Sequence, residues 1–211
     1  MNRITACCII AGRAVSKNDK TLFKNDVASD PVDFLVSAYT HFGFTYPRFY
    51  KMDPLSKLGW LTSEILLTEP PPGIRSLHPE QVGLMLTNAN SSLDTDLKYY
   101  ASVKDIPSPS LFGYTLPNIM IGEICIRNNF KGENTFFITD GFDAGLIRQQ
   151  VDLLIDGNIL KACICGWVDL LREDYKAVLF LVEGGGGDKI ANFTEAIMLD
   201  IFSQCNGVQH E

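Results

Sequence analysis

The residues of this chain best suited to chemistry lie between Gly132 and Gly145, where the sequence reads GENTFFITDGFDAG. The apolar run Thr135–Thr139 is typical of a short strand, and the run Ala144–Ile155 has the pattern of a helix. A strand that turns abruptly into a helix presents one side chain at the helix N-terminus, where backbone N–H groups and the helix dipole favour negative charge. Enzymes place a reactive thiolate or alkoxide at such a turn. The segment therefore resembles the site of a nucleophile.

The turn between the two runs lacks the nucleophile itself. It contains Asp140, Gly141, Phe142 and Asp143, with neither Cys nor Ser. Asp140 and Asp143 could form an acid pair for proton transfer. Acidic residues before a helix more often cap its N-terminus, and this second interpretation is favoured. Covalent catalysis at this turn would have no evident nucleophile.

Length and charge narrow the class of protein. The chain has 211 residues, which is enough for a single domain over residues 1–211. A net charge of −7 without any cluster of Lys or Arg argues against a nucleic-acid surface. No segment approaches the roughly 20 apolar residues of a membrane span, and the apolar run Ile4–Ala11 lies too close to Met1 for a signal peptide. We expect a cytoplasmic protein with Ile4–Ala11 as its first buried strand.

The cysteines and histidines predict no metal site and no cofactor. Cys7, Cys8, Cys163 and Cys165 lie inside apolar runs, as small buried side chains do in a reducing compartment. Neither Cys-Cys nor Cys-x-Cys within a strand has the spacing of metal ligands. None of the three histidines neighbours a cysteine in sequence; they are His41, His78 and His210.

Apolar runs alternate with helical patterns along the chain. Strands are expected at Ile4–Ala11, Val82–Leu86, Thr135–Thr139, Ala162–Val168 and Ala177–Val182, and helices at Leu55–Thr68, Leu116–Phe130, Ala144–Ile155 and 190–204. Residues 16–31 and 87–114 are polar or rich in Asn, Ser and Pro, so we expect connections there. Continuously apolar strands alternating with helices indicate an α/β fold whose mixed, mostly parallel five-stranded sheet is covered by helices on both faces.

A glycine-rich segment, Glu183–Lys189, follows the last expected strand and precedes a helix. That context suits a phosphate-binding loop, but the segment lacks the G-x-x-x-x-G-K-[ST] pattern. A flexible connector is the favoured interpretation.

The order of several short motifs resembles the β-ketoacyl synthases. The sequence FYKMDPLSKL at 49–58 resembles the entry to their first long helix, and QVGLML at 81–86 resembles one of their strands. Lys131-Gly132-Glu133 matches their R-G-P turn, and LKACICGW at 160–167 matches the strand after their nucleophile helix. The resemblance implies a thiolase-like half domain. It is similar to the short, chain-length-factor-like subunits of aryl polyene and type II polyketide systems.

In this resemblance the synthase nucleophile falls on Phe142, flanked by Gly141 and Asp143, and the family's catalytic histidines belong to a second half that the chain is expected to lack. It implies a non-catalytic partner of a full-length β-ketoacyl synthase in aryl polyene, polyketide or fatty-acid-type elongation, with an acyl carrier protein as a further possible contact. Two alternatives stay open: a residual acyl-transfer or decarboxylase enzyme using Asp140 and Asp143, and a stand-alone homodimeric acyl-binding scaffold.

Two structural expectations follow from the resemblance. In ketosynthases the strand corresponding to Thr135–Thr139 pairs with its copy across a dimer axis, so that strand is a candidate interface; its residues are Thr135, Phe136, Phe137, Ile138 and Thr139. The alternative is an interior strand of a monomer. Phe142 is either a gate residue plugging an acyl tunnel or a core aromatic under the turn.

Overall fold

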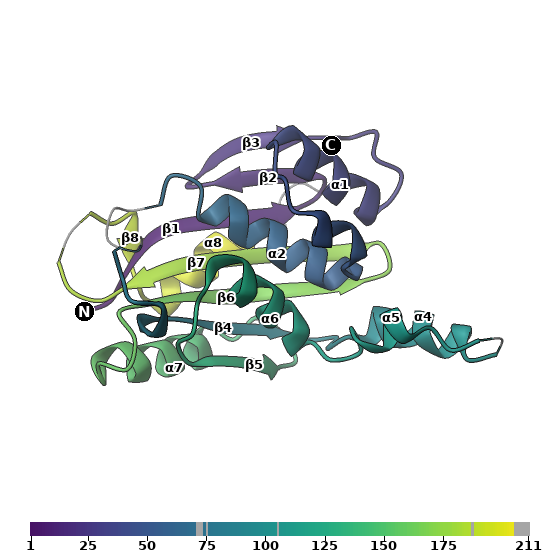
Figure 1. Cartoon of the computed structure of the whole chain (residues 1–211). Helices are drawn as coiled ribbons and strands as arrows, with labels where there is room; N and C mark the ends of the chain where they lie inside the picture. The colour runs from purple at the N-terminus through teal and green to yellow at the C-terminus, as the bar shows by residue number, and fades with distance from the viewer. Residues whose placement is uncertain (71–73, 75, 105, 187, 205–211) are drawn as a thin grey trace.

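One eight-stranded sheet organises the computed structural model, which describes residues 1–70, 74, 76–104, 106–186 and 188–204 (Figure 1). The strands run in the order β3-β2-β1-β7-β6-β4-β5, and β8 pairs with β1. Their bounds are β1 Arg3–Ala11, β2 Ala14–Lys17, β3 Lys20–Lys24, β4 Val82–Asn88, β5 Asn134–Ile138, β6 Ala162–Leu171, β7 Asp174–Glu183 and β8 Ala191–Asn192.

The expected sheet of five mostly parallel strands is wrong in both respects. Only β4 pairs in parallel, with β5 and β6, whereas every other pairing in the described sheet is antiparallel. The short turn at Arg172 folds β7 directly back on β6. The sequence does not predict β2 and β3, because both strands are short and partly exposed and residues 16–31 contain no continuous apolar run.

Helices cover both faces of the sheet, as expected. One face packs against α1, α2 and α6, and the other against α7 and α8. The bounds of the helices are α1 Pro31–His41, α2 Pro54–Leu66, α4 Leu93–Ser102, α5 Pro109–Phe112, α6 Asn118–Asn128, α7 Ala144–Asp156 and α8 Glu195–Gln204, with 3₁₀ turns η1 Pro47–Lys51 and η2 Pro79–Gln81. The last helix begins at Glu195 instead of residue 190 because β8 pairs with β1 just before it.

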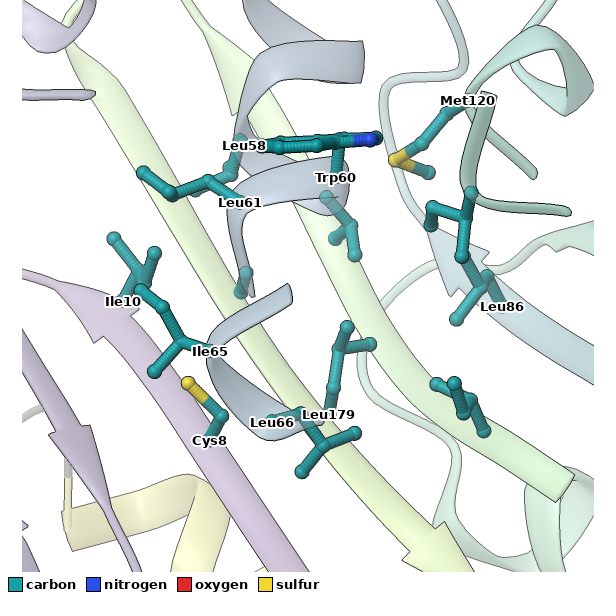
Figure 2. Close-up of a cluster of buried hydrophobic side chains, with 14 of the residues drawn as sticks. Cys8, Ile10, Leu58, Trp60, Leu61, Ile65, Leu66, Leu86, Met120 and Leu179 are labelled. Carbon is teal, nitrogen blue, oxygen red and sulfur yellow. The ribbon is translucent and has the colours of Figure 1, made fainter. Parts of the chain in front are cut away.

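Helix α2 lies over the middle of the sheet, and all of its residues after Pro54 are buried. The carboxylate of Asp53 accepts a hydrogen bond from the Ser56 N–H at 3.0 Å, which is the N-cap that the Asp-Pro pair predicts. Figure 2 shows Trp60 and Ile65 of this helix above the strands that carry Cys8 and Leu179. The hydrophobic core therefore lies mainly between α2 and the central strands.

The expected connection at 87–114 contains two helices, α4 and α5, which extend beyond the sheet from the end of β4 (Figure 1). Aromatic Tyr99 and Phe112 join the two helices, with ring centroids 5.5 Å apart. The apolar residues of α4 are largely exposed. The helix therefore has no apolar face that packs on the core, which is the pattern by which a helix is predicted from sequence.

Candidate functional site

The segment singled out by sequence folds as a strand, a turn and a helix. Strand β5 ends at Ile138, and α7 begins at Ala144. The side chain of Asp143 accepts a hydrogen bond from the Leu146 N–H at 2.9 Å, so the capping interpretation is confirmed for Asp143. Because a carboxylate already occupies the helix N-terminus, an anionic nucleophile or ligand there would meet like charge.

The side chain of Phe142 packs inward, against residues of its own chain. Its ring stacks on Phe202 of α8 with centroids 4.2 Å apart and planes 3° from parallel. It also approaches Trp167 of β6 edge-on at 6.5 Å. The Nζ of Lys176 lies 3.6 Å from the Phe202 ring centroid and donates to the Phe202 carbonyl at 2.7 Å, which ties the end of α8 to β7. These contacts are those of a core aromatic under a turn.

An open cavity of about 730 Å³ borders the turn and α8. The acidic side chains of Asp140, Asp143 and Glu195 line it, together with apolar Ile138 and Leu199. This lining contains no Cys, Ser or His, and the hydroxyl of Thr139 in it donates to the Gly141 carbonyl at 2.8 Å. The side chain of Asp140 is exposed to solvent.

Strand β5 forms one edge of the sheet. Phe136 packs against the core beneath α2 and α6, Phe137 packs against the opposite core, and Ile138 is 58% exposed. The Leu84 N–H donates to the Glu133 carbonyl and the Thr139 N–H to the Asn88 carbonyl. In a parallel ladder this alternation directs the backbone groups of Asn134, Phe136 and Ile138 away from β4.

The opposite edge of the sheet, β3, has a different character. Lys20 and Lys24 stand at its two ends, and both are exposed. Lysines on an edge strand discourage pairing with another chain, because pairing would bury their charge. Strand β5 has the sequence NTFFI, with no charged residue. Of the two edges, β5 is thus the one suited to accept a further strand.

Burial makes four of the described cysteines poor candidates for a reactive thiolate. Burial raises the pKa of the Cys8 and Cys163 thiols to about 12 and that of Cys125 to about 11, and it raises the pKa of Cys165 well above its usual value. Such thiols carry almost no thiolate near neutral pH. Among the described residues, no group of three or more His, Cys, Asp or Glu side chains could hold a metal ion. Cys205 and His210 lie outside the described residues.

Two buried carboxylates that the sequence did not single out join helices instead of forming a site. Glu123 of α6 accepts hydrogen bonds from Arg48 at 2.9 Å and from the Tyr114 hydroxyl at 3.2 Å. Glu64 of α2 accepts one from Arg127 of α6 at 3.0 Å. Burial, followed by the Glu123 carboxylate, raises the pKa of the Tyr114 hydroxyl to about 12. These pairs lie on the α2–α6 side of the sheet, opposite Phe142.

Backbone carbonyls of the glycine-rich segment accept hydrogen bonds from the guanidinium group of Arg3. Arg3 of β1 donates to the carbonyls of Gly184, Gly185 and Asp188. Gly187 lies outside the described residues. A phosphate-binding loop presents its N–H groups to the ligand, so the described part fits the connector interpretation.

No protein-family model matches this sequence, and no curated protein matches it significantly. In the described residues no helix has the length and apolar character needed to cross a membrane. The informative likeness is to solved structures.

Three solved structures share the fold. The ishigamide ketosynthase/chain length factor has a TM-score of 0.62 at 16% identity, over 89% of this chain and 63% of the matched chain. The ketosynthase ApeO in complex with its chain length factor ApeC, from Xenorhabdus doucetiae, gives 0.59 at 13% identity, over 99% and 93%. AntDE:AntF, a type II polyketide synthase acyl-carrier protein in complex with its ketosynthase, gives 0.57 at 12% identity, over 86% and 62%.

The chain thus has a thiolase-like fold similar to ketosynthase and chain length factor proteins. It spans less than two thirds of the matched chains in the first and third structures, but nearly all of the matched chain in the second. At these identities the likeness concerns the fold alone.

Proposed function

We propose that this chain is a non-catalytic, chain-length-factor-like subunit that binds a full-length β-ketoacyl synthase during aryl polyene, polyketide or fatty-acid-type chain elongation. The proposal rests on Phe142, on which the synthase nucleophile falls in the sequence resemblance and whose ring stacks on Phe202. Decarboxylative condensation needs a nucleophile to carry the acyl group and donors to stabilise the developing enolate. A chain without that nucleophile fits a partner better than an enzyme.

The β5 edge supports the choice of contact surface. It is uncharged, it directs the backbone groups of Asn134, Phe136 and Ile138 outward, and Ile138 is 58% exposed. A strand from another subunit can continue the sheet here by main-chain hydrogen bonds, with Ile138 packing against it. Lys20 and Lys24 disfavour the same event at the β3 edge.

The partner that we propose is a synthase and not a second copy of this chain. A homodimer would bring together two turns that each carry Phe142, and it would contain no nucleophile for condensation. A synthase would supply the nucleophile, while this subunit would shape the pocket for the growing chain. In such a complex Phe142 would act as a gate only if the acyl chain reached the Phe142–Phe202 stack.

Co-expression with a β-ketoacyl synthase encoded beside this chain, followed by size-exclusion chromatography, tests the proposal. We expect the two chains to elute together as a heterodimer. Ile138→Lys should abolish co-elution, because pairing would bury the new charge against the partner. Leu22→Lys on β3 is the matched control, since Leu22 is also exposed on an edge strand. Absence of any complex with the wild-type chain, or equal complex formation by both variants, would contradict the proposal.

A further inference from the structure

A second cavity, of about 320 Å³, lies on the α2–α6 side of the sheet, where β4 begins. Its volume falls at the lower end of the range for pockets that take small organic ligands. The walls are mainly apolar and include Leu67, Leu77, Val82 and Phe130, and the polar residues of the described lining are Asn128 and Asn129. Residues 71–73 and 75 lie outside the described residues and form no part of this site. Phe142 packs on the opposite face of the sheet, so the cavity is separate from the turn.

Helices α2 and α6 both end at this cavity. The two helices run in the same direction, since Met120 of α6 packs against Gly59 of α2, and Arg127 of α6 bonds Glu64 of α2. Their C-cap residues both line the cavity; these are Leu67 and Asn129. The last carbonyls of a helix have no partner within the helix and carry partial negative charge, which attracts cations. Two such ends at one cavity favour a positively charged group there and disfavour an anion.

The α2 end already attracts one cation of the chain. The Nζ of Lys17, on β2, donates to the carbonyl of Thr68 and, at 3.2 Å, to its hydroxyl, one residue after the C-cap of α2. The α6 end differs, because the guanidinium of Arg127 bonds Glu64. In the described structure no lysine or arginine side chain donates to the carbonyls of residues 126–128. The α6 end is therefore the one left to a cationic ligand.

Asn128 supplies a hydrogen-bond acceptor beside this end. Its Nδ2 donates to the Glu64 carboxylate at 3.2 Å and to the Ile124 carbonyl at 3.1 Å. These two bonds use both amide hydrogens and fix the orientation of the side chain. The Oδ1 of Asn128 accepts no hydrogen bond from the described residues, so the oxygen is the atom that this side chain has left for a ligand. A ligand that donates hydrogen bonds matches it.

We propose that this cavity binds a small primary alkylammonium ion. The ammonium group lies at the end of α6 near Asn128, and the hydrocarbon chain packs against Leu67, Leu77 and Phe130. A cavity of 320 Å³ has room for roughly ten atoms of the size of a water molecule, so a chain of about six carbons with its ammonium group fits. The site is independent of the proposed function, because it shares no residue with the turn or with the β5 edge.

The test uses three probes with the same six-carbon chain: hexylamine, hexan-1-ol and hexanoate. Each is titrated into the ¹⁵N-labelled protein, and binding is followed by amide chemical shifts. Hexylamine should shift the amides of Leu67, Val82 and Phe130, with a Kd on the order of 1 mM for so small a ligand. Each helix end favours a cation by about two- to fivefold in affinity. Hexylamine should therefore bind about 3- to 25-fold more tightly than hexan-1-ol, and hexanoate should bind most weakly.

A variant that fills the cavity gives a second readout. Leu77→Trp places a larger ring among the lining residues and should abolish the shifts that hexylamine causes. Leu22→Trp, on β3 and outside the cavity, is the control and should bind hexylamine like the wild type. The comparison of the three probes uses the wild-type chain, so it decides the question even where Leu77→Trp fails to fold. Equal affinities for the three probes, tighter binding of hexanoate, or hexylamine shifts that spread over the acidic surface without the cavity amides would overturn the proposal.

Discussion

Replacing Phe142 with alanine removes a ring that stacks on Phe202 at 4.2 Å and meets Trp167 at 6.5 Å. Truncation of a fully buried phenylalanine costs about 3–5 kcal/mol. Phe142 is partly buried, so we expect a loss of roughly 2 kcal/mol in the free energy of unfolding, of which about 1 kcal/mol belongs to the aromatic pair. In a chain of this length that loss lowers the Tm by about 4–8 °C.

Urea unfolding followed by circular dichroism measures the effect in Phe142→Ala, Phe202→Ala and the double variant. The double-mutant cycle should give a coupling energy of about 1 kcal/mol, because each single change already breaks the stack. Tyr100→Ala is the matched control: Tyr100 is 73% exposed, so its loss should change stability by less than about 0.5 kcal/mol. A change below about 0.5 kcal/mol for Phe142→Ala, or strict additivity with Phe202→Ala, would refute the packing derived for the turn.

Three further changes follow from the same contacts. Between pH 9 and 12 the folded chain keeps the buried Cys163 thiol protonated, since its pKa is raised to about 12, while the unfolded chain releases the proton. The free energy of unfolding therefore falls by about 1.4 kcal/mol for each pH unit because of this thiol. Cys163→Ala should reduce the difference between the urea midpoints measured at pH 8 and pH 10.5, and an unchanged difference would contradict the raised pKa. Arg127→Met removes the 3.0 Å ion pair of the buried Glu64 carboxylate, which keeps its hydrogen bond from Asn128, and should cost about 2 kcal/mol by urea unfolding; a neutral result would mean that water replaces the pair. Asp143→Ala removes the cap on the Leu146 N–H and should cost about 1 kcal/mol by the same method, with Asp143→Asn losing much less; equal losses in both would argue against capping.

Local chemistry made much of the site predictable from sequence. The Asp-Pro start of α2 and the β5–turn–α7 segment depend on residues within a few positions of each other, and Asp143 caps its own helix as expected. The absence of Cys and Ser from the turn at 140–143 is a matter of residue identity, so the sequence alone was enough to see it. The apolar runs that became β1, β4, β6 and β7 were recognised because burial on both faces demands continuous apolar sequence.

Tertiary structure decided the features that depend on distant partners. The direction of each strand, the short polar strands β2 and β3, and the pairing of β8 with β1 depend on neighbours far along the chain, which a local pattern does not record. The same holds for the stack of Phe142 on Phe202, sixty residues later, and for the position of β5 at an uncharged edge. Sequence therefore determined what chemistry the turn lacks. Only the fold decided which side chains and which strand edges are exposed, because exposure is a property of the whole packed chain.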